Sequence, residues 1–268
     1  MTLDFITYNT NTETLNFISF AKNFLMPLIA ACTGAFAGGW FNQKYKQKND
    51  FKRDIQYLNY TNSILLSLLN SLYGFKKQFI TSDNVKNEML LLETIKDDVL
   101  DVYLKKDDIK NVTEKFNQFN WLNKKIIQAN YNFPINEEKL SILATTNVNI
   151  YTLILGCKES LEMLNSLIEQ LNQHIQLVEI DIVRYAKPGS GFYQKLYELR
   201  VNLNINIDDC INNMDLLMKC INKSAKLLLS NNKKDKIPFN PLIVDGIEEG
   251  LVPKIQSQYP QLLKWINE

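Results

Sequence analysis

The feature that most constrains this chain is an uncharged, largely apolar segment at residues 24–41, which reads FLMPLIAACTGAFAGGWF. Its eighteen residues are near the lower limit of what a helix needs to cross a hydrocarbon core of about 30 Å. A basic run, NQKYKQKNDFKR, follows at once. We therefore expect residues 24–41 to form a single transmembrane helix, the only membrane span of the chain.

Charges on the two sides of this segment predict its orientation. Lys22 precedes the segment, and a larger group of basic residues follows it: Lys44, Lys46, Lys48, Lys52 and Arg53. Cytoplasmic flanks of membrane helices carry the excess of Lys and Arg. The expectation is a single-pass protein of the bacterial inner membrane, with residues 1–23 as a short extracytoplasmic N-terminus and lead-in, and the C-terminal part in the cytoplasm.

Two other interpretations of the N-terminal region remain open. The run IAAC at 29–32 resembles a lipoprotein processing site that would lipidate Cys32, and AFA at 35–37 resembles a signal-peptidase site. Against export, the residues before the segment carry no net positive charge, and the basic cluster behind it resists translocation. A buried helix of a soluble protein is the remaining alternative.

Small residues recur every four positions within the segment, in two adjacent tracks. The tracks consist of Ala30, Gly34 and Gly38, and of Ala31, Ala35 and Gly39. Helices in lipid gain dispersion contact when small side chains let their backbones approach closely. Since the chain offers one such helix, we expect the partner to be another copy, which predicts a homo-oligomer. Thr33 is the one hydroxyl residue of the segment and could face a pore or bond its own backbone.

The remainder of the chain predicts an all-α fold. Only 9 Gly and 7 Pro occur, as expected for long helices with few breaks. Apolar residues at spacings of three and four predict helices at 51–80, 85–104, after a turn at 105–108 up to about 132, 136–186 and 192–229. Residues 42–232 should thus form a long antiparallel bundle or coiled-coil domain, followed by a tail at 233–268 with a short capping helix at 261–266.

The most regular pattern runs from Leu140 to Tyr185, over seven heptads. Asn147 occupies a core position of that pattern, where a buried polar side chain can fix the register of a bundle. His174 falls beside the seam and is expected on the helix surface. One local conflict remains open, because VNLNINID at 201–208 alternates with period two and would suit a strand.

The sequence offers no catalytic constellation. The single histidine, His174, provides no evident Ser-His or Cys-His pair, and the glutamates build no paired ExxH metal sites. The four cysteines (Cys32, Cys157, Cys210 and Cys220) have no CxxC spacing and are expected to be reduced, buried thiols. We predict a protein that is not an enzyme and that binds neither metal nor cofactor.

Charge limits the class of partner. A net charge of +1 argues against a duplex nucleic-acid ligand, which needs many phosphate contacts. Paired lysines at 76–77, 105–106, 124–125 and 233–234 could hold a small anionic or nucleotide signal if folding gathers them, although solvated helix ends explain such pairs better. The expected partners are the lipid bilayer, further copies of the chain, and such a signal or a cognate protein regulator.

The small-residue segment with its basic flank at 24–53, joined to an all-helical remainder, resembles single-span bacterial membrane effectors of phage-defence systems. That resemblance implies an oligomeric ion channel or membrane-disrupting assembly gated by a cytoplasmic helical sensor, in antiphage defence. It carries over no ligand-binding residue. The alternative expectation is a membrane-tethered coiled-coil scaffold or adaptor without a pore, whose heptads form the working surface.

Overall fold

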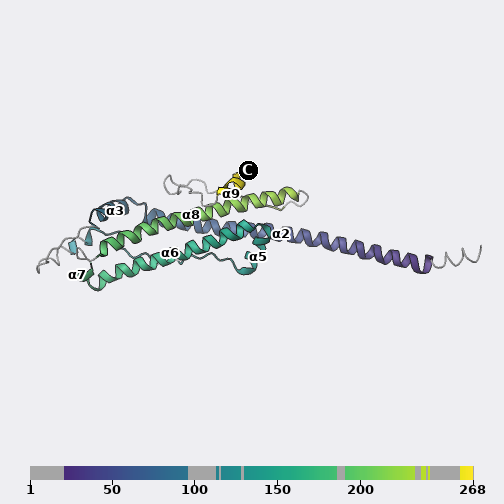
Figure 1. Cartoon of the computed structure of the whole chain (residues 1–268), viewed down its shortest axis with the longest axis horizontal. Coiled ribbons are helices and arrows are strands. Elements are labelled where there is room, and N and C mark those ends of the chain that lie inside the picture. Colours follow the sequence, from purple (N-terminus) through teal and green to yellow (C-terminus); the bar gives the residue numbers. More distant parts are fainter. Residues whose placement is uncertain are drawn as a thin grey trace, which may run out of the picture. The chain divides into compact units, whose positions relative to one another are not determined.

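The computed structural model describes residues 21–95, 113–114, 116–127, 130–185, 191–232, 237–239, 241 and 260–267. Every regular element within these ranges is a helix, so the predicted all-α class is confirmed (Figure 1). The chain divides into two compact units, an N-terminal unit, Met1–Arg53, and a helical unit, Asp54–Glu268.

The described part of the N-terminal unit is helical throughout. A π-helical turn, η1 (Ala21–Leu25), leads into α2 (Met26–Phe79), a helix of 54 residues. Within the described residues, no helix combines the length and the apolar character that crossing a bilayer requires. The expected span at 24–41 is thus not supported. The first two residues of the expected span belong to η1, and the remaining part, from Met26 to Phe41 of α2, rises only about 24 Å at 1.5 Å per residue.

The helical unit continues from α2 into α3 (Asp83–Ile95). Further along the chain, from residue 137 onward, the described residues form α5 (Glu137–Thr146), α6 (Val148–Ile180), α7 (Ile182–Tyr185), α8 (Phe192–Asn231) and α9 (Pro260–Asn267). Helices α6 and α8 lie side by side (Figure 1). Gly191 caps the start of α8 with φ of 76°, a left-handed conformation that costs glycine little.

Polar contacts fix the direction of α8 against α6. Asn147, just before α6, donates to Ser224 Oγ at 2.9 Å, and further along α6 Ser160 accepts from Asn213 at 2.8 Å. Later residues of α6 therefore meet earlier residues of α8. The two helices pack antiparallel.

The same reasoning applies to α8 and the part of α2 that belongs to the helical unit. Asn62 Nδ2 donates to Asn222 Oδ1 at 3.0 Å, and Lys76 Nζ contacts Asp208 Oδ1 at 2.5 Å. These pairs also run in opposite directions along the two helices. Helix α8 thus packs antiparallel to both α2 and α6.

Apolar side chains at spacings of three and four form the core between these helices, as the sequence predicts. Fully or almost fully buried residues come from α2 (Ile55, Leu58, Leu65, Leu69, Leu72), from α6 (Ile150, Ile154, Cys157, Leu161, Leu164, Ile168, Leu171, Ile175) and from α8 (Leu196, Leu203, Ile207, Cys210, Met214, Leu217, Ile221). Burying such side chains is the main favourable term of the fold.

The structure corrects two predicted helices and resolves the conflict at residues 201–208. The predicted uninterrupted helix at 136–186 is broken at Asn147 and Asp181, both in extended conformation. The predicted helix that reaches 132 ends early, because residues 125–127 and 130–136 are not helical. By contrast, residues 201–208 are helical inside α8, since the surrounding three-four pattern outweighs the local period of two.

The C-terminal helix matches the predicted short helix at 261–266. Lys223 of α8 donates its Nζ proton to the Trp265 carbonyl, and the same ammonium lies 4.9 Å from the centre of the Trp265 ring. These contacts attach α9 to α8.

Candidate functional site

The N-terminal unit carries an apolar helix that no other described residue covers. Every residue at 25–49 is exposed within the described structure. The large apolar side chains among them include Leu25, Met26, Leu28, Ile29, Phe36, Trp40 and Phe41, with Phe36 exposed by 83%. A helix that is apolar on all sides normally lies in a protein interior or in lipid. This segment is the candidate functional site.

The six predicted packing residues all lie on this uncovered part of α2. They are Ala30, Ala31, Gly34, Ala35, Gly38 and Gly39, and each of them is exposed. A Cβ atom built on Gly34, Gly38 or Gly39 would meet no atom within 4 Å among the described residues. Their small size is therefore not required by any contact that the described part of the chain makes.

Thr33 bonds to its own helix. Its hydroxyl donates to the carbonyl oxygens of Ile29 at 2.8 Å and Ala30 at 3.1 Å. Such back-bonding satisfies a hydroxyl without water and is a common way for a helix to carry threonine in apolar surroundings. The sequence predicts that Thr33 either faces a pore or bonds its own backbone, and these two hydrogen bonds are of the second kind.

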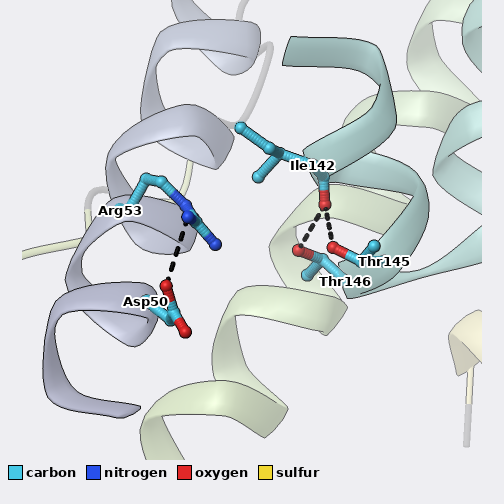
Figure 2. A network of polar contacts seen from close by, with 5 residues as sticks. All are labelled: Asp50, Arg53, Ile142, Thr145 and Thr146. Carbon is cyan, nitrogen blue, oxygen red and sulfur yellow. Dashed lines mark hydrogen bonds and ion pairs between the residues drawn. The ribbon is translucent and has the colours of Figure 1, made fainter. Parts of the chain in front are cut away.

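Aromatic and charged side chains follow the apolar segment along α2. The Trp40 and Phe41 rings meet edge to face with centroids 5.2 Å apart, and Lys44 Nζ lies 3.8 Å from the centre of the Trp40 ring. Arg53, at the end of the unit, pairs with Asp50 one turn earlier, at 3.1 Å (Figure 2). Aromatic rings next to cationic side chains are typical of helix ends at a membrane interface.

In the helical unit, polar residues at intervals of seven along α6 hold an extended segment. Asn165 and Asn172 each bond both the N–H and the C=O of one residue, Tyr131 and Ile126 respectively, at 2.8–3.1 Å. The same spacing continues in both directions, where Lys158 donates to the Ile135 carbonyl at 3.2 Å and Glu179 pairs with Lys125 at 2.5 Å. We call these four residues of α6 the polar ladder. Sequence analysis missed it, although the spacing of seven was available as a signal.

Asn147 lies at the break between α5 and α6 rather than inside a continuous helix. It is the C-cap of α5 and the N-cap of α6, where its Oδ1 accepts from the Asn149 N–H at 2.9 Å. Its Nδ2 donates to Ser224 of α8. The hydroxyls of Thr145 and Thr146, directly before Asn147, both donate to the carbonyl of Ile142 about one turn earlier (Figure 2).

The paired lysines are not gathered into one anion site within the described structure. Lys76 is 4% exposed and pairs with Asp208, and Lys125 pairs with Glu179. Lys124 lies over the Trp121 ring, 3.8 Å from its centre. The pairs at 105–106 and 233–234 lie outside the described residues.

His174 and three cysteines are used in packing. The His174 ring stacks on Phe192 with centroids 4.4 Å apart, its Nε2 lies 3.0 Å from the Phe192 carbonyl oxygen, and burial lowers its pKa. Burial also raises the pKa values of the Cys157, Cys210 and Cys220 thiols, and Cys32 is exposed. In the described ranges, no group of three or more His, Cys, Asp or Glu residues is placed to hold a metal ion.

Comparison of the chain with protein-family models, with curated proteins and with solved structures finds no match.

Proposed function

We propose that this protein is an oligomeric membrane effector, in which residues 24–41 of several copies assemble in a lipid bilayer and the helical unit controls the assembly. The observation that carries the proposal is the apolar helix at 25–41, which is exposed on all sides within the described structure. Water is a poor solvent for such a surface, so a cover of lipid, of further copies, or of both is favoured.

Geometry supports a short membrane helix that oligomerises. Helix η1 adjoins α2 directly, so residues 24–41 are helical throughout, and the α-helical part from Met26 to Phe41 rises about 24 Å at 1.5 Å per residue. A helix slightly shorter than the hydrocarbon core is accommodated by local thinning of the bilayer or by association with other helices. The open space beside Gly34 and Gly38 is where the backbone of a second copy would approach.

The rival function, a membrane-tethered scaffold that works through its heptads, has less support. The apolar residues of that pattern on α6, such as Ile154, Leu161 and Ile168, are buried in the chain's own core. They would have to leave that core to bind a partner. The helical unit is better suited to act as one body that transmits a signal to the N-terminal segment. A role in antiphage defence rests on the architectural resemblance alone.

Ion flux from liposomes tests the proposal. Purified protein reconstituted in vesicles should release a trapped ion or dye under some signal condition, and the double variant Gly34→Leu with Gly38→Leu should neither assemble nor release it. Phe36→Leu is the matched control, because Phe36 lies about 160–200° around the helix from both glycines at 100° per residue. Wild-type protein that is monomeric in bilayers would overturn the proposal.

A further inference from the structure

A basic stretch follows the apolar segment on the same helix, α2, and within the same N-terminal unit. Residues 42–53 contain one acidic residue, Asp50, which is also the first acidic residue of α2. They contain five basic residues, which are all exposed: Lys44, Lys46, Lys48, Lys52 and Arg53. This stretch is therefore strongly cationic, although the whole chain has a net charge of only +1. A concentrated positive charge of this kind attracts a negatively charged surface.

Three of the lysines form a row along one side of α2. At 100° per residue, Lys44, Lys48 and Lys52 fall within an arc of about 80°, and we call them the lysine stripe. Asp50 and Arg53 pair with each other at 3.1 Å (Figure 2). Both lie at least about 100° around the helix from each lysine of the stripe. The acidic residue thus offsets a basic residue on another side of α2, and the charge of the stripe is left in place.

Aromatic rings lie on the same side of α2 as the lysine stripe. Trp40, Phe41 and Tyr45 are each within about 40° of the nearest lysine of the stripe, at 100° per residue. Lys44 Nζ lies 3.8 Å from the centre of the Trp40 ring, so this ammonium is held at the aromatic end of the apolar segment. Tryptophan and tyrosine are enriched where a membrane helix meets the lipid headgroups. The stripe therefore begins where headgroups would begin.

The depth of the first two lysines also fits a layer of headgroups. Lys44 and Lys48 lie about 5 and 10 Å beyond Phe41 along the axis of α2, at 1.5 Å per residue. The headgroup layer on each side of a hydrocarbon core is about 5–8 Å thick. With their long side chains, both lysines reach this layer when residues 24–41 lie in the core.

A lipid surface suits the lysine stripe better than a nucleic acid does. The stripe rises about 12 Å from its first lysine to its last, which allows few of the phosphate contacts that binding to duplex DNA requires. The adjoining apolar segment also needs an apolar cover, which a bilayer provides and a nucleic acid does not.

We propose that the lysine stripe binds anionic phospholipids, so that the N-terminal unit prefers a membrane with negatively charged headgroups to a zwitterionic one. The ammonium groups of Lys44 and Lys48 contact the phosphates of these lipids. This inference rests on the proposed function, because the stripe meets headgroups only when residues 24–41 lie in a bilayer.

Quenching of tryptophan fluorescence by brominated lipids tests the preference. The full-length protein is reconstituted in mixed vesicles in which either phosphatidylglycerol or phosphatidylcholine carries bromine near the headgroup end of its chains. The contribution of Trp40 is the difference between the wild type and Trp40→Phe. Phosphatidylglycerol should associate about fivefold more strongly than phosphatidylcholine at low salt, and the difference should shrink in about 1 M salt.

Two double variants that each remove two positive charges locate the site. Lys44→Gln with Lys48→Gln should lower the preference for phosphatidylglycerol below about twofold, whereas Lys44→Arg with Lys48→Arg should keep it. The matched control is Lys46→Gln with Arg53→Gln, outside the stripe, which should lower the preference less. Equal losses in the two glutamine variants would contradict the assignment to the stripe.

The outcomes separate this inference from the proposed function. Quenching of Trp40 by neither lipid would overturn both, since residues 24–41 would not lie in a bilayer. Equal quenching by the two lipids would overturn the preference alone. A fluorescent DNA duplex is the competing partner: if it binds the full-length protein in about 0.1 M salt and Lys44→Gln with Lys48→Gln abolishes that binding, the stripe serves a nucleic acid and the proposal is wrong.

Discussion

Asn165 of α6 bonds both backbone groups of Tyr131, accepting from its N–H at 3.1 Å and donating to its C=O at 2.8 Å. An extended segment packed against a helix has no neighbouring strand to satisfy its amides and carbonyls. The asparagine side chain supplies one donor and one acceptor in the place of a strand. Asn172 repeats the arrangement seven residues later, with Ile126.

The polar ladder should therefore contribute to stability through the backbone groups that Lys158, Asn165 and Asn172 bond. Asn172→Ala leaves the N–H and C=O of Ile126 without these partners and should lower the free energy of unfolding by about 2 kcal/mol, from roughly 1 kcal/mol for each lost bond. Gln176→Ala, on an exposed position of the same helix, should change it by less than about 0.5 kcal/mol. Urea denaturation followed by circular dichroism compares the two, and equal effects would contradict this role.

Asn147 should matter through its two side-chain bonds at the break between α5 and α6. Asn147→Ala removes a helix N-cap and the bond to Ser224, and we expect a loss of about 2 kcal/mol in the free energy of unfolding. Thr145→Ala provides the control, since Thr145 is exposed and bonds only the carbonyl of its own helix among the contacts described. Thermal unfolding of both variants measures the two effects. If Asn147→Ala is as stable as the wild type, the break between α5 and α6 needs no cap.

His174 should make stability depend on pH. Burial is the main cause of its lowered pKa, and the nearby Lys195 acts in the same direction. The unfolded chain then binds the proton more readily, so the free energy of unfolding should fall as pH drops below about 6.5, the ordinary histidine value. His174→Gln should remove this part of the slope between pH 7 and 5. An identical slope in the variant would mean that other groups cause it.

The four thiols should react differently with a membrane-impermeant maleimide. Burial raises the pKa values of Cys210 and Cys220 to about 12 and that of Cys157 as well, so these three should react only after unfolding. Cys32 is exposed in the chain itself and should react in protein free of lipid, but not in protein reconstituted in vesicles, where the proposed assembly covers it. Mass spectrometry of tryptic peptides counts the labels. Rapid labelling of Cys32 in vesicles would argue against insertion.

The helical core could be predicted because one physical rule fixes it. Apolar residues at spacings of three and four must share a face of a helix, and Leu161, Ile168 and Ile207 are buried as that rule requires. The rule also gave the correct result at 201–208, where eight residues alternate but the flanking pattern is helical.

The extended segment that ends before α5 could not be predicted in the same way. Its buried residues, Ile126, Tyr131 and Phe133, pack as a strand-like chain whose backbone partners are side chains of α6 far away in the sequence. The spacing of seven along α6 marks the polar side chains, but it does not say which distant segment they bond. The burial of Arg200 was missed for a related reason, since a single arginine in a helical pattern is usually a solvated residue and only the fold buries it.

The central claim is that copies of residues 24–41 assemble in a bilayer, and counting the copies tests it most directly. Native mass spectrometry of the full-length protein released from lipid nanodiscs measures the mass of the assembly. The account predicts several chains of 31.1 kDa per particle for the wild type and for Phe36→Leu, and a single chain for Gly34→Leu with Gly38→Leu. A single chain in every wild-type particle would contradict it.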